Sequence, residues 1–97
     1  MEEVIYYNDL YDIYKSLLTD KQKLYFEDYY FNNLSYGEMS EKYNISRNAC
    51  YKQLKFVIDK LIDLEDKLKI YYKNKKIEVL IKKIDNHNIK KELENLL

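Results

Sequence analysis

The chain has 97 residues, of which 46% are hydrophobic and 35% charged, and it carries no net charge at neutral pH. That length supports one hydrophobic core, and the scarcity of helix breakers, with one glycine and no proline, favours an all-α fold. A single cysteine excludes a disulfide framework. We therefore expect one helical domain over residues 1–97, with a helix-turn-helix core at about residues 8–60 and a helical extension at about residues 61–97.

The N-terminal third of the chain predicts two helices. Apolar residues at helical spacing indicate a first helix at about residues 7–17. Thr19 and Gln22 have the spacing of a capping box, which predicts that a second helix starts there and runs to a pair of asparagines. Among its aromatic residues, Phe26 or Tyr30 is a candidate for contact with a partner. The inward-facing side chains of this helix are expected to be Leu24, Tyr25, Tyr29 and Phe31.

The middle of the chain predicts a helix-turn-helix. Ser35 and Glu38 have the spacing of a second capping box, which opens a short third helix, and Asn44 suits the left-handed turn after it. Ser46 is expected to cap a long fourth helix that begins at Arg47, the one arginine in the chain. The inward-facing side chains of this unit are expected to be Met39, Tyr43, Ile45, Cys50 and Leu54.

The exposed face at the start of the fourth helix carries residue types that bind nucleic acid. Arginine can grip guanine or a phosphate, asparagine can pair with adenine, and lysine suits phosphates. Backbone N–H groups at the Ser46 cap can bind another phosphate. In the alternative interpretation, the hairpin is a scaffold whose polar face is simply solvated. The candidate nucleic-acid-binding residues are Ser46, Arg47, Asn48, Tyr51, Lys52 and Lys55.

Apolar residues in the fourth helix recur at alternating steps of three and four, as in a coiled-coil seam. This seam predicts a homodimer, unless the C-terminal helices fold back and cover it within one chain. A polar stretch at residues 73–76 is expected to end the long helix. An amphipathic helix around residues 77–84 and a short last helix after a break at residues 86–88 should follow. The candidate oligomer seam is Leu54, Val57, Leu61, Leu64, Leu68 and Tyr71.

The neutral total conceals two halves of opposite sign. Residues 1–45 hold four lysines against nine Asp and Glu, whereas residues 46–97 hold thirteen Lys and Arg against eight Asp and Glu. A basic second half is compatible with nucleic-acid contact through one face, although the acidic first half would repel a duplex. The same asymmetry is compatible with self-association of unlike halves.

The sequence predicts no catalytic, metal or cofactor site. His87 is the one histidine in the chain, and the single cysteine, Cys50, falls on an inward helical face. One glycine cannot build a phosphate-binding loop. No apolar run approaches the roughly 20 residues of a membrane span. We therefore expect a non-enzymatic, cytoplasmic protein without a cofactor.

The segment from Leu10 to Leu68 resembles the YlxM-like family of small helix-turn-helix proteins. The resemblance rests on "LYDIY", "LLTDKQ", "LSYGEMSEKYNISRNA" and the long helix after them. The recognition helix of that family usually starts with "ISRQAVYD". This chain departs from it at Cys50, where valine is usual, and at Lys52, where an acidic residue is common. The hairpin is also similar to region 4 of bacterial sigma factors.

The resemblance implies an all-helical bacterial protein without enzymatic activity that acts in or regulates the signal recognition particle pathway. Two hypotheses follow. The protein is a dimeric, sequence-specific DNA-binding regulator, or it is an interaction module for a protein or RNA of that pathway and keeps the hairpin only as a scaffold. The candidate partners are accordingly DNA, RNA and components of the signal recognition particle.

Overall fold

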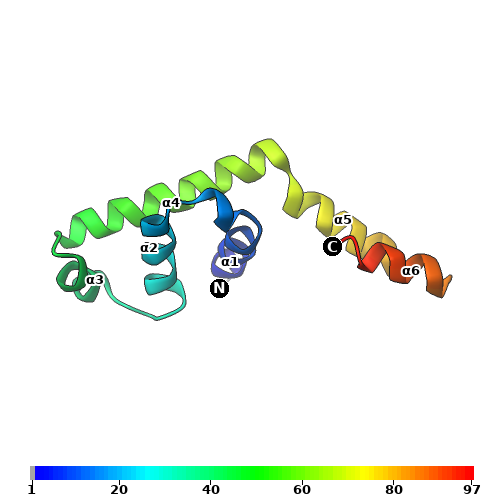
Figure 1. Ribbon diagram of the computed structural model, residues 1–97, viewed down its shortest axis with the longest axis horizontal. Helices are drawn as coiled ribbons and strands as arrows, with labels where there is room; N and C mark the ends of the chain where they lie inside the picture. The colour runs from blue at the N-terminus through cyan, green and yellow to red at the C-terminus, as the bar shows by residue number, and fades with distance from the viewer. Residues whose placement is uncertain (1) are drawn as a thin grey trace.

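The computed structural model describes residues 2–97 and contains helices but no strand in that range. The prediction of an all-α fold is confirmed. The molecule measures 56 × 25 × 22 Å, because the last two helices extend away from the other four as an arm (Figure 1). The elements are α1 (Glu2–Tyr14), the 3-10 turn η1 (Lys15–Leu17), α2 (Asp20–Tyr30), α3 (Tyr36–Tyr43), α4 (Arg47–Leu68), α5 (Ile70–Ile81) and α6 (His87–Glu94).

The main core lies where α1 and α2 pack against α4. Phe26 of α2 is completely buried and stacks against Tyr11 of α1, with the two ring centroids 4.3 Å apart. Val57 and Leu61 of α4 complete the cluster and are also fully buried. Helical stability in proteins comes mainly from such packing, so this cluster holds α4 against the N-terminal helices. The buried members are Leu10, Tyr11, Tyr14, Leu18, Phe26, Val57 and Leu61.

The start of α2 agrees with its prediction, whereas the bounds of α1 do not. The Thr19 hydroxyl accepts a hydrogen bond from the Gln22 amide at 3.2 Å, and the Gln22 side chain accepts one from the Thr19 amide at 2.9 Å. This is the predicted capping box. The preceding helix was expected at about residues 7–17, but α1 already begins at Glu2 and gives way to η1 at Lys15. In its first two turns, Tyr6 packs on Tyr71 and Tyr7 packs on Tyr30, and such packing favours the earlier start.

The buried face of α2 matches the predicted one in part, since Tyr25 is buried and Tyr29 is half-buried, as expected. Leu24 and Phe31 were expected to point inward, but they are 48% and 47% exposed. Phe26, a predicted candidate for partner contact, lies instead at the centre of the main core. Aromatic side chains occur on nearly every side of this helix. Spacing alone therefore could not identify the side that α1 and α4 cover.

The apolar seam of α4 is largely covered within the chain. Leu54, Val57 and Leu61 are buried by the chain's own helices, and Leu64 is half-buried against the main core. Leu68, the last residue of α4, is 45% exposed. The first four seam residues thus have intramolecular neighbours, and the exposed part of the seam is confined to the end of the helix.

A sharp elbow at Lys69 separates α4 from α5. Lys69 has a left-handed backbone conformation, with φ of 54° and ψ of 33°, and α5 begins at the next residue. Tyr71, predicted as part of the α4 seam, therefore belongs to α5. The predicted break at residues 73–76 is also wrong, because this stretch lies inside α5. Lysine is a good helix former, so a polar run on a largely solvated helix does not end it.

The arm consists of α5 and α6, which pack against each other. Near the elbow, Tyr71 of α5 contacts Tyr6 of α1, with ring centroids 5.1 Å apart. Ile81 is buried at the end of α5, whereas no residue of α6 is fully buried. Asn86 caps α6, since its side chain accepts hydrogen bonds from the amides of Asn88 and Ile89 at 3.0 and 3.1 Å. The predicted break at residues 86–88 is therefore the start of the last helix.

Candidate nucleic-acid interface

The predicted helix-turn-helix is formed by α3, the turn after it and the start of α4. Asn44 has the expected left-handed conformation, with φ of 55° and ψ of 45°. The Ser46 hydroxyl accepts a hydrogen bond from the Ala49 amide at 3.0 Å, which caps α4. Ser35 and Glu38 form the predicted capping box at the start of α3. These local interactions fix where each helix of the hairpin begins.

A second, smaller core joins the hairpin to α2. Met39 of α3 and Cys50 of α4 are fully buried beside Tyr25 of α2. Tyr43 and Ile45 pack against this cluster, as predicted. The free thiol of Cys50 therefore serves as a small apolar core side chain. Because this face of α4 is buried, the opposite face of its first turns is presented to solvent.

A buried carboxylate that the sequence analysis did not identify connects α2 to the end of α3. Asp28 is 2% exposed and accepts hydrogen bonds from Lys42 Nζ at 3.0 and 3.1 Å. Asn32 Nδ2 donates to it at 3.2 Å, and the Tyr43 hydroxyl donates as well. Burial by itself raises the pKa of Asp28, but these three donors outweigh burial and hold the pKa below its usual value. The ionised carboxylate thus sets the position of α3 relative to α2.

Replacing Asp28 with asparagine is expected to lower the free energy of unfolding by about 1–3 kcal/mol at neutral pH, because hydrogen bonds to a buried ionised acceptor are lost. In the unfolded chain an aspartate has a pKa of about 3.9, and in the folded chain the pKa of Asp28 is lower. The stabilisation is therefore complete above pH about 4 and disappears as the pH falls through the folded pKa. Urea unfolding of both proteins at neutral and acid pH measures this difference.

The matched control is Asp12→Asn, which makes the same chemical change at an exposed site on α1. This control should change the free energy of unfolding by less than about 0.5 kcal/mol at any pH. A difference between the wild type and Asp28→Asn that stays constant into strong acid would contradict a stabilising role of the ionised carboxylate.

All six candidate nucleic-acid-binding residues are exposed, and they lie at the end of α4 that adjoins α3 (Figure 1). With about 3.6 residues per turn, the five on α4 occupy less than half of its circumference. Arg47 lies against the first turn of α3, because a Cβ atom added to Gly37 would be 3.2 Å from Arg47 Nη2. The single glycine of the chain thus leaves room for its single arginine.

Two further contacts position residues on this face. The ring of Tyr51 packs edge-on against Tyr36 of α3, with centroids 5.9 Å apart. Lys55 Nζ lies 3.0 Å from Asp59 Oδ2, one turn further along α4, and both side chains are more than half exposed. An exposed pair of this kind is weak, so a phosphate can compete with Asp59 for the lysine. The i, i+4 spacing of Lys55 and Asp59 is the signal in the sequence that indicates this pair.

The exposed face at the start of α4 offers hydrogen-bond donors and acceptors and positive charge to a ligand.

Other kinds of site have no counterpart in the part of the chain that the structure describes. Within residues 2–97, no group of three or more His, Cys, Asp and Glu side chains is placed to hold a metal ion. His87 is exposed at the start of α6. Over the same range, none of the helices combines the length and the apolar character that a membrane crossing requires.

Known sequences are similar to this chain along its whole length. The UPF0122 family, described as "Putative helix-turn-helix protein, YlxM / p13 like", matches residues 1–97. A UPF0122 protein of Fusobacterium nucleatum subsp. nucleatum is 42% identical over 101 residues, which cover 100% of this chain and 98% of the relative. UPF0122 proteins of Mycoplasma capricolum subsp. capricolum and Anoxybacillus flavithermus are 39% and 38% identical and cover 92% and 90% of this chain, with 79% of each relative matched. Together with the observed hairpin, this similarity means that the chain belongs to the UPF0122 family of YlxM/p13-like helix-turn-helix proteins.

Proposed function

We propose that this protein is a non-enzymatic regulator that binds nucleic acid, with duplex DNA as the favoured ligand, through the start of α4. The observation that carries the proposal is the common exposure of Arg47, Asn48 and Lys52 on a helix whose opposite face is buried. In DNA-binding helix-turn-helix proteins, the second helix enters the major groove and the first helix crosses the backbone. Here α4 is the second helix, and α3 is the first.

Each exposed residue type on this face is suited to a different group of the DNA. The planar guanidinium of Arg47 can make two parallel hydrogen bonds to guanine in a fixed geometry that the single ammonium of a lysine lacks. Its contact with Gly37 restricts the side chain before any ligand is bound. Asn48 suits adenine, and Lys52 suits a phosphate. The free N–H groups at the capped start of α4 favour a second phosphate.

Arg47→Ala is expected to weaken binding about 5- to 150-fold to a duplex selected from a random-sequence pool, the equivalent of about 1–3 kcal/mol for one lost base contact. The substitution removes an exposed side chain, so the helical circular dichroism spectrum should not change. Fluorescence anisotropy of the labelled duplex measures the affinity. The titration is repeated at several salt concentrations, because phosphate contacts make the affinity fall steeply with salt.

The matched control is Lys91→Ala, which removes one exposed positive charge from α6, outside the hairpin. Lys52→Ala should instead weaken binding to all duplexes alike and reduce the slope of log affinity against log salt by about one. The DNA-binding proposal fails if the wild-type protein shows no salt-sensitive retention of any duplex from the pool.

A second candidate function is favoured by acidic side chains near the hairpin. Glu38 and Glu41 on α3 are exposed, and Asp59 follows Lys55 on α4. These carboxylates would repel a duplex but suit a protein surface. The hairpin would then be a scaffold for a partner in the signal recognition particle pathway, the role that the family resemblance implies. A pull-down from lysate with and without nuclease separates the two functions, since recovery of the signal recognition particle protein after nuclease contradicts a pure DNA regulator.

A further inference from the structure

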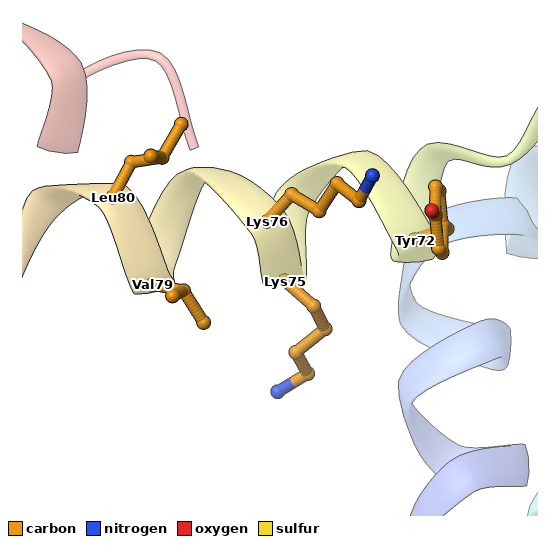
Figure 2. A pocket seen from close by; sticks show the side chains of 5 residues that line it. All are labelled: Tyr72, Lys75, Lys76, Val79 and Leu80. Carbon is orange, nitrogen blue, oxygen red and sulfur yellow. The ribbon is translucent and has the colours of Figure 1, made fainter.

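The arm exposes an apolar stripe along α5. Tyr72, Val79 and Leu80 are 51%, 52% and 56% exposed, and with Lys75 and Lys76 they line an open pocket of about 520 Å³ (Figure 2). Figure 2 shows Lys76 running along the helix toward Tyr72, and its Nζ lies 4.7 Å from the centroid of that ring. We call these five residues the arm stripe. Clusters of exposed apolar side chains bordered by charge mark interaction sites.

A groove of about 440 Å³ lies on the body of the molecule, between α1, α2, α3 and α4. Glu3 and Asp59 lie at its border, and Lys55 is paired with Asp59 there. Tyrosine is enriched in protein–protein interfaces, because its ring is apolar and its hydroxyl can hydrogen-bond. We call this groove the tyrosine groove, and the lining residues that matter here are Tyr7, Tyr29, Tyr30, Tyr36, Tyr51 and Ile62. Tyr51 and Lys55 are also candidate nucleic-acid-binding residues, so an arm docked in the groove covers these two, whereas Arg47, Asn48 and Lys52 do not line it.

The two surfaces differ in charge. The tyrosine groove is lined by the carboxylates of Glu3 and Asp59 and by one lysine, Lys55, which is paired with Asp59. Residues 70–97, which form the arm, carry seven lysines against four Asp and Glu. Two arms would therefore repel each other, whereas an arm and the groove carboxylate Glu3 attract. We propose that the tyrosine groove binds the arm stripe of a second copy of this chain, in a two-fold symmetric dimer.

Two-fold symmetry requires that each copy supplies the same two surfaces, so both arms dock and both grooves are filled. The arm is held away from the groove of its own chain. At the elbow, Glu65 binds the amides of Tyr71 and Tyr72, and α5 leaves α4 at the end opposite α3 (Figure 1). A second copy is therefore the occupant that the charges and the elbow favour. This interface replaces the α4 seam, most of which is buried within the chain.

Sedimentation of the full-length protein over a wide concentration range tests the dimer. The wild type is expected to reach twice its monomer mass of 12.0 kDa. Leu80→Asp in the arm stripe and Ile62→Asp in the groove should each raise the dissociation constant at least about tenfold, as expected for a central interface residue. Both side chains are exposed, at 56% and 40%, so these variants should fold. Phe56→Asp is the matched control, since Phe56 is 59% exposed on α4 and does not line the groove.

A charge exchange distinguishes this dimer from one in which two arms pair. Lys76→Glu and Glu3→Lys should each weaken association, and the double variant should recover it, because the attraction is restored with reversed signs. Direct pairing of two arms would instead be strengthened by Lys76→Glu and unaffected by Glu3→Lys. A wild type that stays monomeric at all concentrations would leave the groove to a different partner and overturn the proposal. Failure of the double variant to recover association would overturn it as well.

Discussion

Replacing Phe26 with alanine is expected to lower the free energy of unfolding by about 3–5 kcal/mol, the range for a buried phenylalanine. The ring is fully buried and lies 4.3 Å from Tyr11 and 4.7 Å from Tyr30, measured between ring centroids. Its removal leaves a cavity where α1 and α2 meet α4. A small domain is stable by only about 5–15 kcal/mol, so the variant should unfold at much lower urea concentration, as measured by far-ultraviolet circular dichroism.

Phe56→Ala is the matched control, because it deletes the same ring from a position that is 59% exposed. It should change the free energy of unfolding by less than about 0.5 kcal/mol. Similar losses in the two variants would contradict the position of Phe26 at the centre of the core. A large loss in Phe26→Ala alone would also show that this residue does not serve as a partner contact.

The hairpin was predictable because its signals are local. Thr19, Ser35 and Ser46 each cap a helix through a hydrogen bond to an amide three residues further along the chain. Asn44 tolerates the left-handed turn that few other residue types accept. Such interactions depend on four or five neighbouring residues, so the sequence contains all the information they require. The exposed face of α4 follows directly, since helix geometry places its residues once the cap is known.

Features that depend on distant residues were not predictable in the same way. Phe26 is buried and Leu24 is not, because α1 and α4 cover only one side of α2. Asp28 gains its significance from Lys42 and Tyr43, which lie 14 and 15 residues further along the chain. A helical pattern shows that a face is apolar without showing which element covers it. The α4 seam illustrates this, since it has the spacing of a coiled coil but packs mostly within the chain, against α1 and α2 rather than against the C-terminal helices that were the expected alternative.

The elbow is the clearest case, because one buried carboxylate joins three helices. Glu65, which is 7% exposed, accepts hydrogen bonds from the Tyr14 hydroxyl at 2.6 Å and the Tyr71 amide at 2.9 Å. Its second oxygen accepts from the Tyr72 amide at 3.1 Å. Burial and the hydrogen bond to Glu65 raise the pKa of Tyr14 to about 12, so the hydroxyl stays protonated and donates. The first amides of a helix lack intrahelical acceptors, and Glu65 supplies them for α5.

Glu65→Ala is expected to lower the free energy of unfolding by about 2–4 kcal/mol, because it removes charge-assisted hydrogen bonds and leaves buried donors without an acceptor. The amides of Tyr71 and Tyr72 should then exchange faster with solvent, because the first turn of α5 loses its cap. Amide hydrogen exchange followed by NMR measures this effect residue by residue. The arm should lose its fixed direction along with this protection.

The neighbouring exposed carboxylate provides the control, since Asp66→Ala should leave both stability and exchange almost unchanged. Tyr14→Phe removes one donor of the network and should reproduce part of the loss. The double variant of Tyr14 and Glu65 should lose less than the sum of the single losses, because the two side chains share one hydrogen bond. Unchanged protection of the Tyr71 and Tyr72 amides in Glu65→Ala would mean that the elbow is held by the packing of Tyr71 on α1 rather than by the carboxylate.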